Sequence, residues 1–140
     1  MEIKKIVVAY DGSSESERAL NWAIDLAGKL RSDVVVVSVV KPPEFSPTIS
    51  EIEEFYEDGE KHFRPLLNKV EEKVNSLIIS LRTEILRGHP AESIVRYAFD
   101  RRADLVVMGT RGTGGFKSLI IGSVAQKVVA YSKVPVVVIK

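Results

Sequence analysis

Four short apolar runs, rich in β-branched residues, constrain the fold of this chain more than any other feature. They are Ile6–Tyr10, Val34–Val40, Leu105–Met108 and Val136–Ile139. None alternates apolar with polar residues, as a strand with one solvated face would. Such continuous apolarity is typical of strands buried on both faces, and hence of a parallel sheet covered by helices. A fifth, more polar run at residues 82–86 predicts an edge strand.

Helical spacing of apolar residues separates the runs. Ser14 and Glu17 predict a capping box that starts the first helix. From residue 49 to residue 77 apolar residues recur every three or four positions, but Gly59 and Pro65 interrupt the pattern. Because proline and glycine disturb helices, that stretch predicts either one kinked helix or two helices.

Two further helices are predicted by their starting residues. Pro90 suits the first position of a third helix, and Gly122-Ser123 opens a fourth. Strands and helices then alternate, which predicts the α/β class: a single five-stranded parallel sheet, doubly wound, with helices on both faces. Residues 1–140 are expected to form one domain.

An acidic segment lies in the middle of the chain. Residues 44–60 contain seven acidic residues and no basic one. We expect an exposed excursion before the second helix there. The segment is either ordinary solvated surface or a docking region.

Composition excludes several classes of function. The 20 Lys and Arg balance 19 Asp and Glu, and no cluster of five basic residues occurs, so no nucleic-acid partner is expected. With no Cys and only two distant His, thiolate catalysis, iron–sulfur clusters and His-built metal sites are disfavoured. The apolar runs are far shorter than the ~20 residues of a membrane span, so no membrane partner is expected. The short, soon acidic N-terminus does not resemble a signal peptide, which predicts a cytoplasmic protein.

Residues that could bind a ligand directly follow two of the predicted strands. Asp11 comes directly after the first strand, and a Gly-rich stretch, which begins at Gly109, follows the fourth and leads to Gly122-Ser123. Five of the nine glycines lie between positions 109 and 122. In open α/β sheets, ligands bind at the carboxyl ends of strands where the strand order reverses.

The Gly-rich stretch has two interpretations. Glycines let backbone N–H groups turn toward an anion, and Ser123 at a helix start, Arg111 and Lys117 would add donors and positive charge. Alternatively, the stretch is only a turn and Ser123 an ordinary N-cap. Neither the Walker loop nor the dinucleotide-binding motif fits, because Phe116 precedes Lys117 and a lysine stands where the third glycine is needed.

The spacing Gly109-x2-Gly112-x9-Gly122-Ser123, together with Asp11, closely resembles the ATP-binding branch of the universal stress protein family. The resemblance extends over the whole chain and implies a Rossmann-like fold of the adenine-nucleotide alpha hydrolase-like type. It also implies a cofactor, ATP or another adenine nucleotide, with Mg²⁺ held mainly by the phosphates.

The same resemblance implies a role for each binding residue. Asp11 would meet the ribose hydroxyls, and the base would lie beside Ala9, Val39 and Met108. The phosphates would meet Gly109, Gly112, Gly122, Ser123 and Val124. Tyr10 and Arg111 adjoin these positions and complete the predicted set. Ala9 stands where many members carry Pro, which loosens the predicted base pocket.

Three functions remain open from the sequence. They are an ATP-binding regulatory or stress-response module, a slow ATP-hydrolysing enzyme, and a dimeric interaction protein for which nucleotide is incidental. No catalytic residue is predicted, because the one carboxylate near the loop, Asp11, is assigned to the ribose. The apolar run 135–140 at a predicted sheet edge, and the resemblance, both favour a homodimer through that strand.

Overall fold

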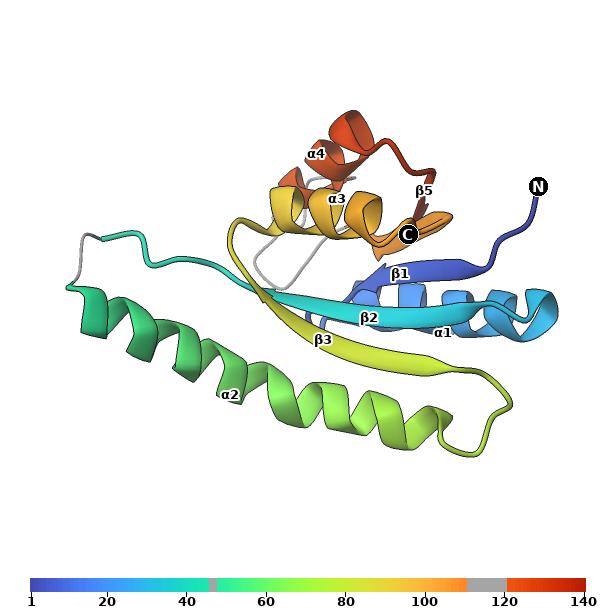
Figure 1. Cartoon of the computed structure of the whole chain (residues 1–140), viewed down its shortest axis with the longest axis horizontal. Helices are drawn as coiled ribbons and strands as arrows, with labels where there is room; N and C mark the ends of the chain where they lie inside the picture. The colour runs from blue at the N-terminus through green and yellow to red at the C-terminus, as the bar shows by residue number, and fades with distance from the viewer. Residues whose placement is uncertain (46–47, 111–120) are drawn as a thin grey trace.

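The computed structural model describes residues 1–45, 48–110 and 121–140. Along the chain its elements are β1 (Lys5–Ala9), α1 (Ser14–Leu30), β2 (Asp33–Val40), α2 (Ile49–Val74), β3 (Leu81–Arg87), α3 (Pro90–Asp100), β4 (Leu105–Gly109), α4 (Ser123–Tyr131) and β5 (Val136–Ile139). The five strands form one parallel sheet in the order β3-β2-β1-β4-β5. The predicted fold class is therefore confirmed (Figure 1).

The strand order reverses beside β1. From β1 the chain builds outward to β2 and β3, then returns to place β4 on the other side of β1. In the register, Val8 of β1 lies opposite Val107 of β4, so the two strands end next to each other. A doubly wound sheet opens a crevice at such a reversal, since the flanking crossovers diverge there.

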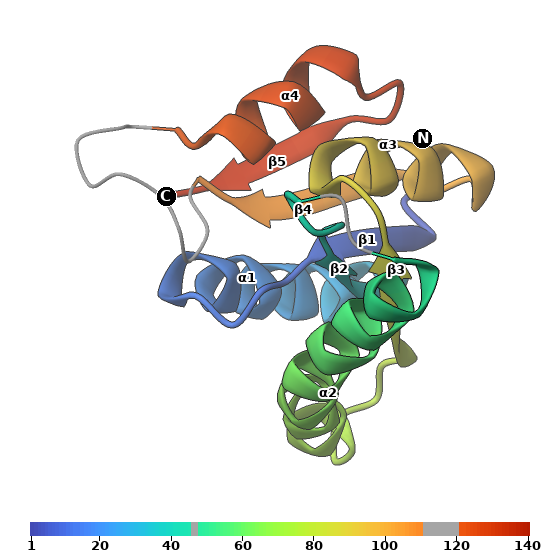
Figure 2. The same ribbon diagram turned by 90° about the vertical axis from the view of Figure 1, so that its left-hand side faces the viewer.

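The two faces of the sheet carry separate apolar cores. Viewed toward the strand ends, α1 and α2 lie on one face and α3 and α4 on the other (Figure 2). Side chains alternate between the faces along each strand, as the pleat requires. In β1, for example, Ile6 and Val8 enter the core under α1 and α2, whereas Val7 enters the core under α3 and α4.

The start of α1 differs by one residue from the prediction. Ser13, not Ser14, is the N-cap, and its hydroxyl accepts a hydrogen bond from the Ser16 N–H at 3.1 Å. The reason is local: Gly12 takes a positive φ of 86°, so Ser13 enters the helix from extended backbone. Glu17 accepts from the Tyr10 hydroxyl instead of completing a capping box.

The second helix is one continuous element. It contains both Gly59 and Pro65 and ends at Val74, before the last apolar residue of the predicted pattern. Gly59 is needed because a Cβ there would lie 2.3 Å from Cγ1 of Val40, at the end of β2. The acidic residues from position 49 onward are therefore helical. The prediction that they form an exposed excursion before the second helix is wrong.

Two of these acidic residues have a defined partner. Arg87, the last residue of β3, donates to Glu53 at 2.9 Å and to Glu60 at 3.0 Å, and its guanidinium lies over the ring of Tyr56. The hydrogen bond from Arg87 lowers the pKa of Glu60 below its usual range. The acidic half of α2 is thus fastened to the sheet at the end of β3. Among the described residues no helix is long and apolar enough to cross a bilayer.

Candidate functional site

The strand ends beside the reversal gather the residues predicted to surround a base. Met108 is buried in the core under α3 and α4, and Ala9 and Val39 pack partly buried against the same core, as does Val124, which was predicted to meet the phosphates. They come from β1, β2, β4 and α4, which lie far apart in the sequence. The fold thus brings together an apolar surface at the carboxyl ends of the strands, where a planar ligand could bind.

Asp11 lies in the turn between β1 and α1, half-buried. Its Oδ1 accepts from the Ser13 N–H at 3.0 Å, which fixes the carboxylate against the turn. The preceding residue is also fixed, because the buried Ser38 hydroxyl donates to the Tyr10 carbonyl at 2.6 Å. A carboxylate held in this way loses little rotamer entropy when it accepts a ligand hydroxyl.

Tyr10 does not join this group. Its ring is buried in the core under α1 and α2, on the opposite face of the sheet from Ala9. Its hydroxyl donates to Glu17 at 2.7 Å. Burial, reinforced by that hydrogen bond, raises the pKa of Tyr10 well above its usual value. The structure therefore gives this side chain a structural role, and the strand alternation that places it with Ile6 and Val8 was visible in the sequence.

Gly109 ends β4 against the first turn of α1. A Cβ at this position would lie 2.7 Å from the backbone carbon of Glu15, so only glycine allows the close approach. Thr110 follows, buried, with its N–H bonded to the Ile139 carbonyl at 3.0 Å and its carbonyl accepting from the Gly122 N–H. Sequence reasoning missed Thr110, which joins β4, β5 and the start of α4; a small polar residue directly after a buried strand was the available signal.

The start of α4 brings Ser123 to the same end of the sheet. Gly122 is the N-cap and Ser123 the first helical residue, with an exposed side chain. The first N–H groups of a helix and its dipole favour an anion nearby. Arg111 and Gly112, like Lys117, lie outside the described residues.

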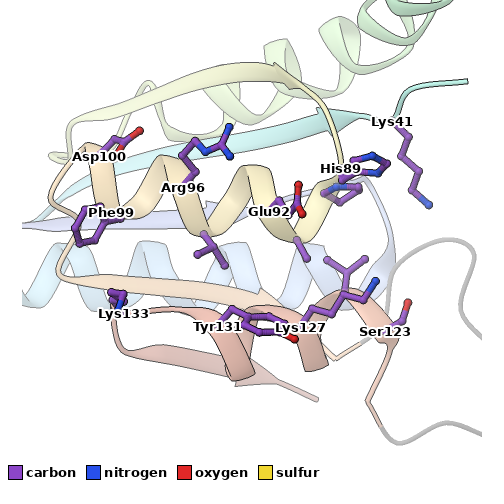
Figure 3. Close-up of a pocket in the computed structure, with 14 residues that line it drawn as sticks. Lys41, His89, Glu92, Arg96, Phe99, Asp100, Ser123, Lys127, Tyr131 and Lys133 are labelled. Carbon is purple, nitrogen blue, oxygen red and sulfur yellow. The ribbon is translucent and has the colours of Figure 1, made fainter.

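A groove of about 980 Å³ runs between α3 and α4 and begins beside this site. Ser123 and Val124 line one end of it, together with Lys41, which follows β2, and His89, which precedes α3. Figure 3 shows Lys41, His89 and Ser123 at the same end. Sequence reasoning did not find the groove or Lys41, because no motif marks them.

Comparison with known proteins identifies the family. The model of the universal stress protein family matches residues 2–140. This chain belongs to that family. Universal stress protein MJ0531 of Methanocaldococcus jannaschii is 35% identical over 139 residues, which cover 98% of this chain and 82% of the relative. The universal stress protein in the QAH/OAS sulfhydrylase 3' region of Thermus aquaticus is 36% identical over 140 residues, 98% of each chain.

Solved structures of universal stress proteins share the fold. UspA from Lactobacillus plantarum superimposes with a TM-score of 0.91 at 24% identity, over 100% of this chain and 99% of that chain. A universal stress protein solved in complex with cAMP has a TM-score of 0.74 at 23% identity, over 98% and 97%. One from Archaeoglobus fulgidus in complex with dAMP has a TM-score of 0.70 at 23% identity, over 100% of both chains.

Metal-binding side chains do not cluster in the described ranges: no group of three or more His, Asp or Glu there could hold an ion. At the strand ends Asp11 supplies a carboxylate, the start of α4 supplies backbone N–H groups and Ser123 supplies a hydroxyl. This set matches the sugar and phosphates of a nucleotide better than a metal ion held by protein ligands alone.

Proposed function

We propose that this universal stress protein binds an adenine nucleotide, ATP foremost, in the crevice between the ends of β1 and β4. The observation that carries the proposal is the packing of Ala9, Val39 and Met108 on one apolar core at the strand ends, with the fixed carboxylate of Asp11 directly after β1. An apolar patch beside one oriented acceptor suits a purine ring joined to a ribose.

Different residues would contact the base, the ribose and the phosphates of the nucleotide. The apolar side chains hold the base, and Asp11 accepts from ribose hydroxyls. The phosphates lie toward Gly109, Gly122 and the start of α4 at Ser123, with Arg111 and Gly112 contributing as the family motif implies. Mg²⁺, if the nucleotide brings it, is held mainly by the phosphates. The relatives solved with cAMP and dAMP support the choice of an adenine nucleotide.

The site suits binding and regulation better than fast chemistry. Efficient phosphoryl transfer needs a base or oriented water and charge stabilisation at the γ-phosphate. Asp11 is committed to the turn and to the ribose. We therefore propose a nucleotide-dependent regulatory or stress-response module, acting in the cytoplasm, whose hydrolysis of ATP is far slower than the roughly 1–100 s⁻¹ of kinases.

The binding proposal is tested by thermal unfolding of nucleotide-free protein with and without ATP. A ligand present at 100 times its dissociation constant adds ~2.7 kcal/mol of stability by mass action. Mass spectrometry of the denatured protein verifies that no nucleotide was carried through purification. An unchanged melting temperature in millimolar ATP would refute the proposal.

The variant Asp11→Asn tests whether the carboxylate of Asp11 contributes to ATP binding. Asparagine keeps an Oδ1 that can accept from the Ser13 N–H, so the turn survives, but it removes the charge that strengthens a hydrogen bond to ribose. We expect weaker ATP binding and an unchanged melting temperature of the free protein. Asp25→Asn, at an exposed position of α1, is the matched control.

We also propose a homodimer through β5. The carbonyls of Pro135 and Ile139 bond to β4, so the backbone groups of Val136 and Val138 point to the open edge of the sheet. The long helix α2 covers the β2 and β3 side of the sheet and lies away from this edge (Figure 2). Light scattering tests the dimer: a concentration-independent mass of 15.5 kDa would exclude it.

A further inference from the structure

The groove between α3 and α4 carries positive charge that forms no ion pair among the residues that the structure describes. Arg96 of α3, Lys127 of α4, and Lys133 in the turn after α4 line it together with Lys41. Within the described ranges none of the four forms an ion pair, whereas Arg87, Arg101 and Lys73 elsewhere all do. The groove also contains two carboxylates, Glu92 and Asp100, which leaves it net positive.

The floor and far end of the groove are apolar. Val95 forms part of the floor, half-buried, and Phe99 and Tyr131 stand at the far end with 59% and 72% of their surfaces exposed. Exposed aromatic side chains bordered by charges are typical of surfaces that bind a partner. In Figure 3 Arg96 stands on the side of α3 turned away from α4, Lys133 lies at the same end of the groove as Phe99, and Ser123 marks the opposite end.

The shape of the groove selects among anionic partners. It follows α3, whose 11 residues extend about 16 Å, enough for three turns of another helix. A concave channel between two helices fits the ridge of a third helix, as in other helix-in-groove complexes. A flat bilayer surface would reach the rims but not the floor at Val95.

We propose that this groove binds an amphipathic helix of a partner protein, with its apolar side on Val95, Phe99 and Tyr131 and acidic residues toward the four cations. Docking as such does not depend on the nucleotide. The groove shares Ser123 and Val124 with the proposed phosphate site, however. If that site holds ATP, the phosphates offset the positive charge at this end, and ATP weakens the binding of an acidic segment.

The test uses a fluorescent synthetic peptide of about fifteen residues, four helical turns, with Leu and Phe on one face and Glu on the others. Anisotropy is measured with the full-length, nucleotide-free protein. We expect saturable binding that weakens as salt is raised, because the contacts are charged. One control peptide replaces Glu by Lys, and a second replaces Leu and Phe by Ser; neither should bind.

Groove variants locate the contact. Arg96→Glu combined with Lys133→Glu should weaken peptide binding roughly tenfold, because lost attraction is added to new repulsion at two exposed sites. Both residues lie away from Ser123, so ATP binding should not change (Figure 3). Lys61→Glu combined with Lys69→Glu, at exposed positions of α2, is the matched control and should bind the peptide like the wild type.

Three outcomes overturn the docking of a partner helix, and a fourth overturns only its coupling to ATP. Equal weakening by the α2 variants would show unspecific charge attraction. Binding to anionic vesicles but not to the peptide would identify a membrane surface instead. Assembly of the protein beyond a dimer, competing with the peptide, would make the acidic α2 of a second copy the occupant. If the peptide binds and ATP binds but neither affects the other, docking stands and the coupling is wrong.

Discussion

The two faces of the sheet are built for different purposes. Under α1 and α2 the core is closed: Leu67 is 0% exposed, and Lys73 and Arg87 pair with carboxylates across the elements. Under α3 and α4 the core is buried near the strands, but the helices leave an open groove whose cations form no ion pair with another described residue. The face under α1 and α2 therefore supplies most of the stability. The face under α3 and α4, beside the strand reversal, can then keep an open groove for binding.

Truncating a side chain on each face should show the largest difference in stability between the two faces. Leu67→Ala removes a fully buried side chain of α2, and we expect a loss of about 2–5 kcal/mol in the free energy of unfolding. Val95→Ala, half-buried beside the groove, should cost about 1 kcal/mol, since solvent can fill the space. Urea denaturation measures both. Equal losses would mean that the groove side is packed as tightly as the closed face.

The close contact between α2 and β2 gives the next largest effect. Gly59→Ala places a Cβ against Val40, and the overpacking of about 1–3 kcal/mol exceeds the gain of roughly 1 kcal/mol in helix propensity. Gly28→Ala in α1 meets nothing within 4 Å and should instead stabilise the protein. The same urea experiment decides between them. A stabilising Gly59→Ala would show that α2 can lift off the sheet without cost.

Much of this closed face was predictable from the sequence, and its details show why. The four apolar runs predicted β1, β2, β4 and β5, because a strand buried on both faces has few alternatives, and the more polar run at residues 82–86 predicted β3 as an edge strand. The continuity of α2 through Pro65 was not predictable, since tertiary packing decides whether a helix tolerates a proline. The N-cap was misplaced from Ser13 to Ser14 because the positive φ of Gly12 is not encoded by a capping pattern.

The candidate site was predictable only in part. Family spacing placed Asp11 and Met108, and the fold gathers them at adjacent strand ends. Tyr10 was grouped with them by its position in the motif, although period-two alternation points its side chain to the other face. The groove cations, such as Arg96 and Lys127, could not be recognised in the sequence, because only the packing of α3 beside α4 brings them to one groove.

Each face contains a buried tyrosine, so the two faces can also be compared by the dependence of stability on pH. The hydroxyl of Tyr97, a residue of α3, donates to Glu84 as that of Tyr10 does to Glu17. Burial first, and then this hydrogen bond, raise the pKa of Tyr97 to about 12. An unfolded tyrosine ionises near pH ~10, so the unfolded state loses its protons first, and stability falls as pH rises from about 10 to 12.

Removing each hydroxyl should reduce that alkaline loss. Tyr97→Phe and Tyr10→Phe each delete one hydrogen bond, at a cost of about 1 kcal/mol at neutral pH. Each variant should then lose less stability than the wild type between neutral and alkaline pH, as measured by chemical denaturation at a series of pH values. Tyr131→Phe, an exposed tyrosine, is the control and should follow the wild type. An unchanged alkaline slope in both buried variants would assign the loss to other groups.

The smallest expected effect concerns two arginines. Arg87 forms ion pairs, and Arg96 forms none with the residues that the structure describes. Arg87→Gln breaks the contacts from β3 to Glu53 and Glu60, and because all three groups are solvated, the melting temperature should fall only slightly. The difference should vanish in high salt, which screens exposed charges. It should also shrink as the pH falls below about 4.3, the usual pKa of Glu, and vanish once Glu60 is protonated in the folded state, because the lowered pKa of Glu60 stabilises the fold only while the carboxylate is ionised. Arg96→Gln, with no ion pair in the described part of the chain, should leave the melting temperature unchanged in every buffer while weakening the binding of an acidic peptide. If Arg96→Gln lowers the melting temperature as much as Arg87→Gln does, the groove cation serves the fold, and the division of labour between the two faces is wrong.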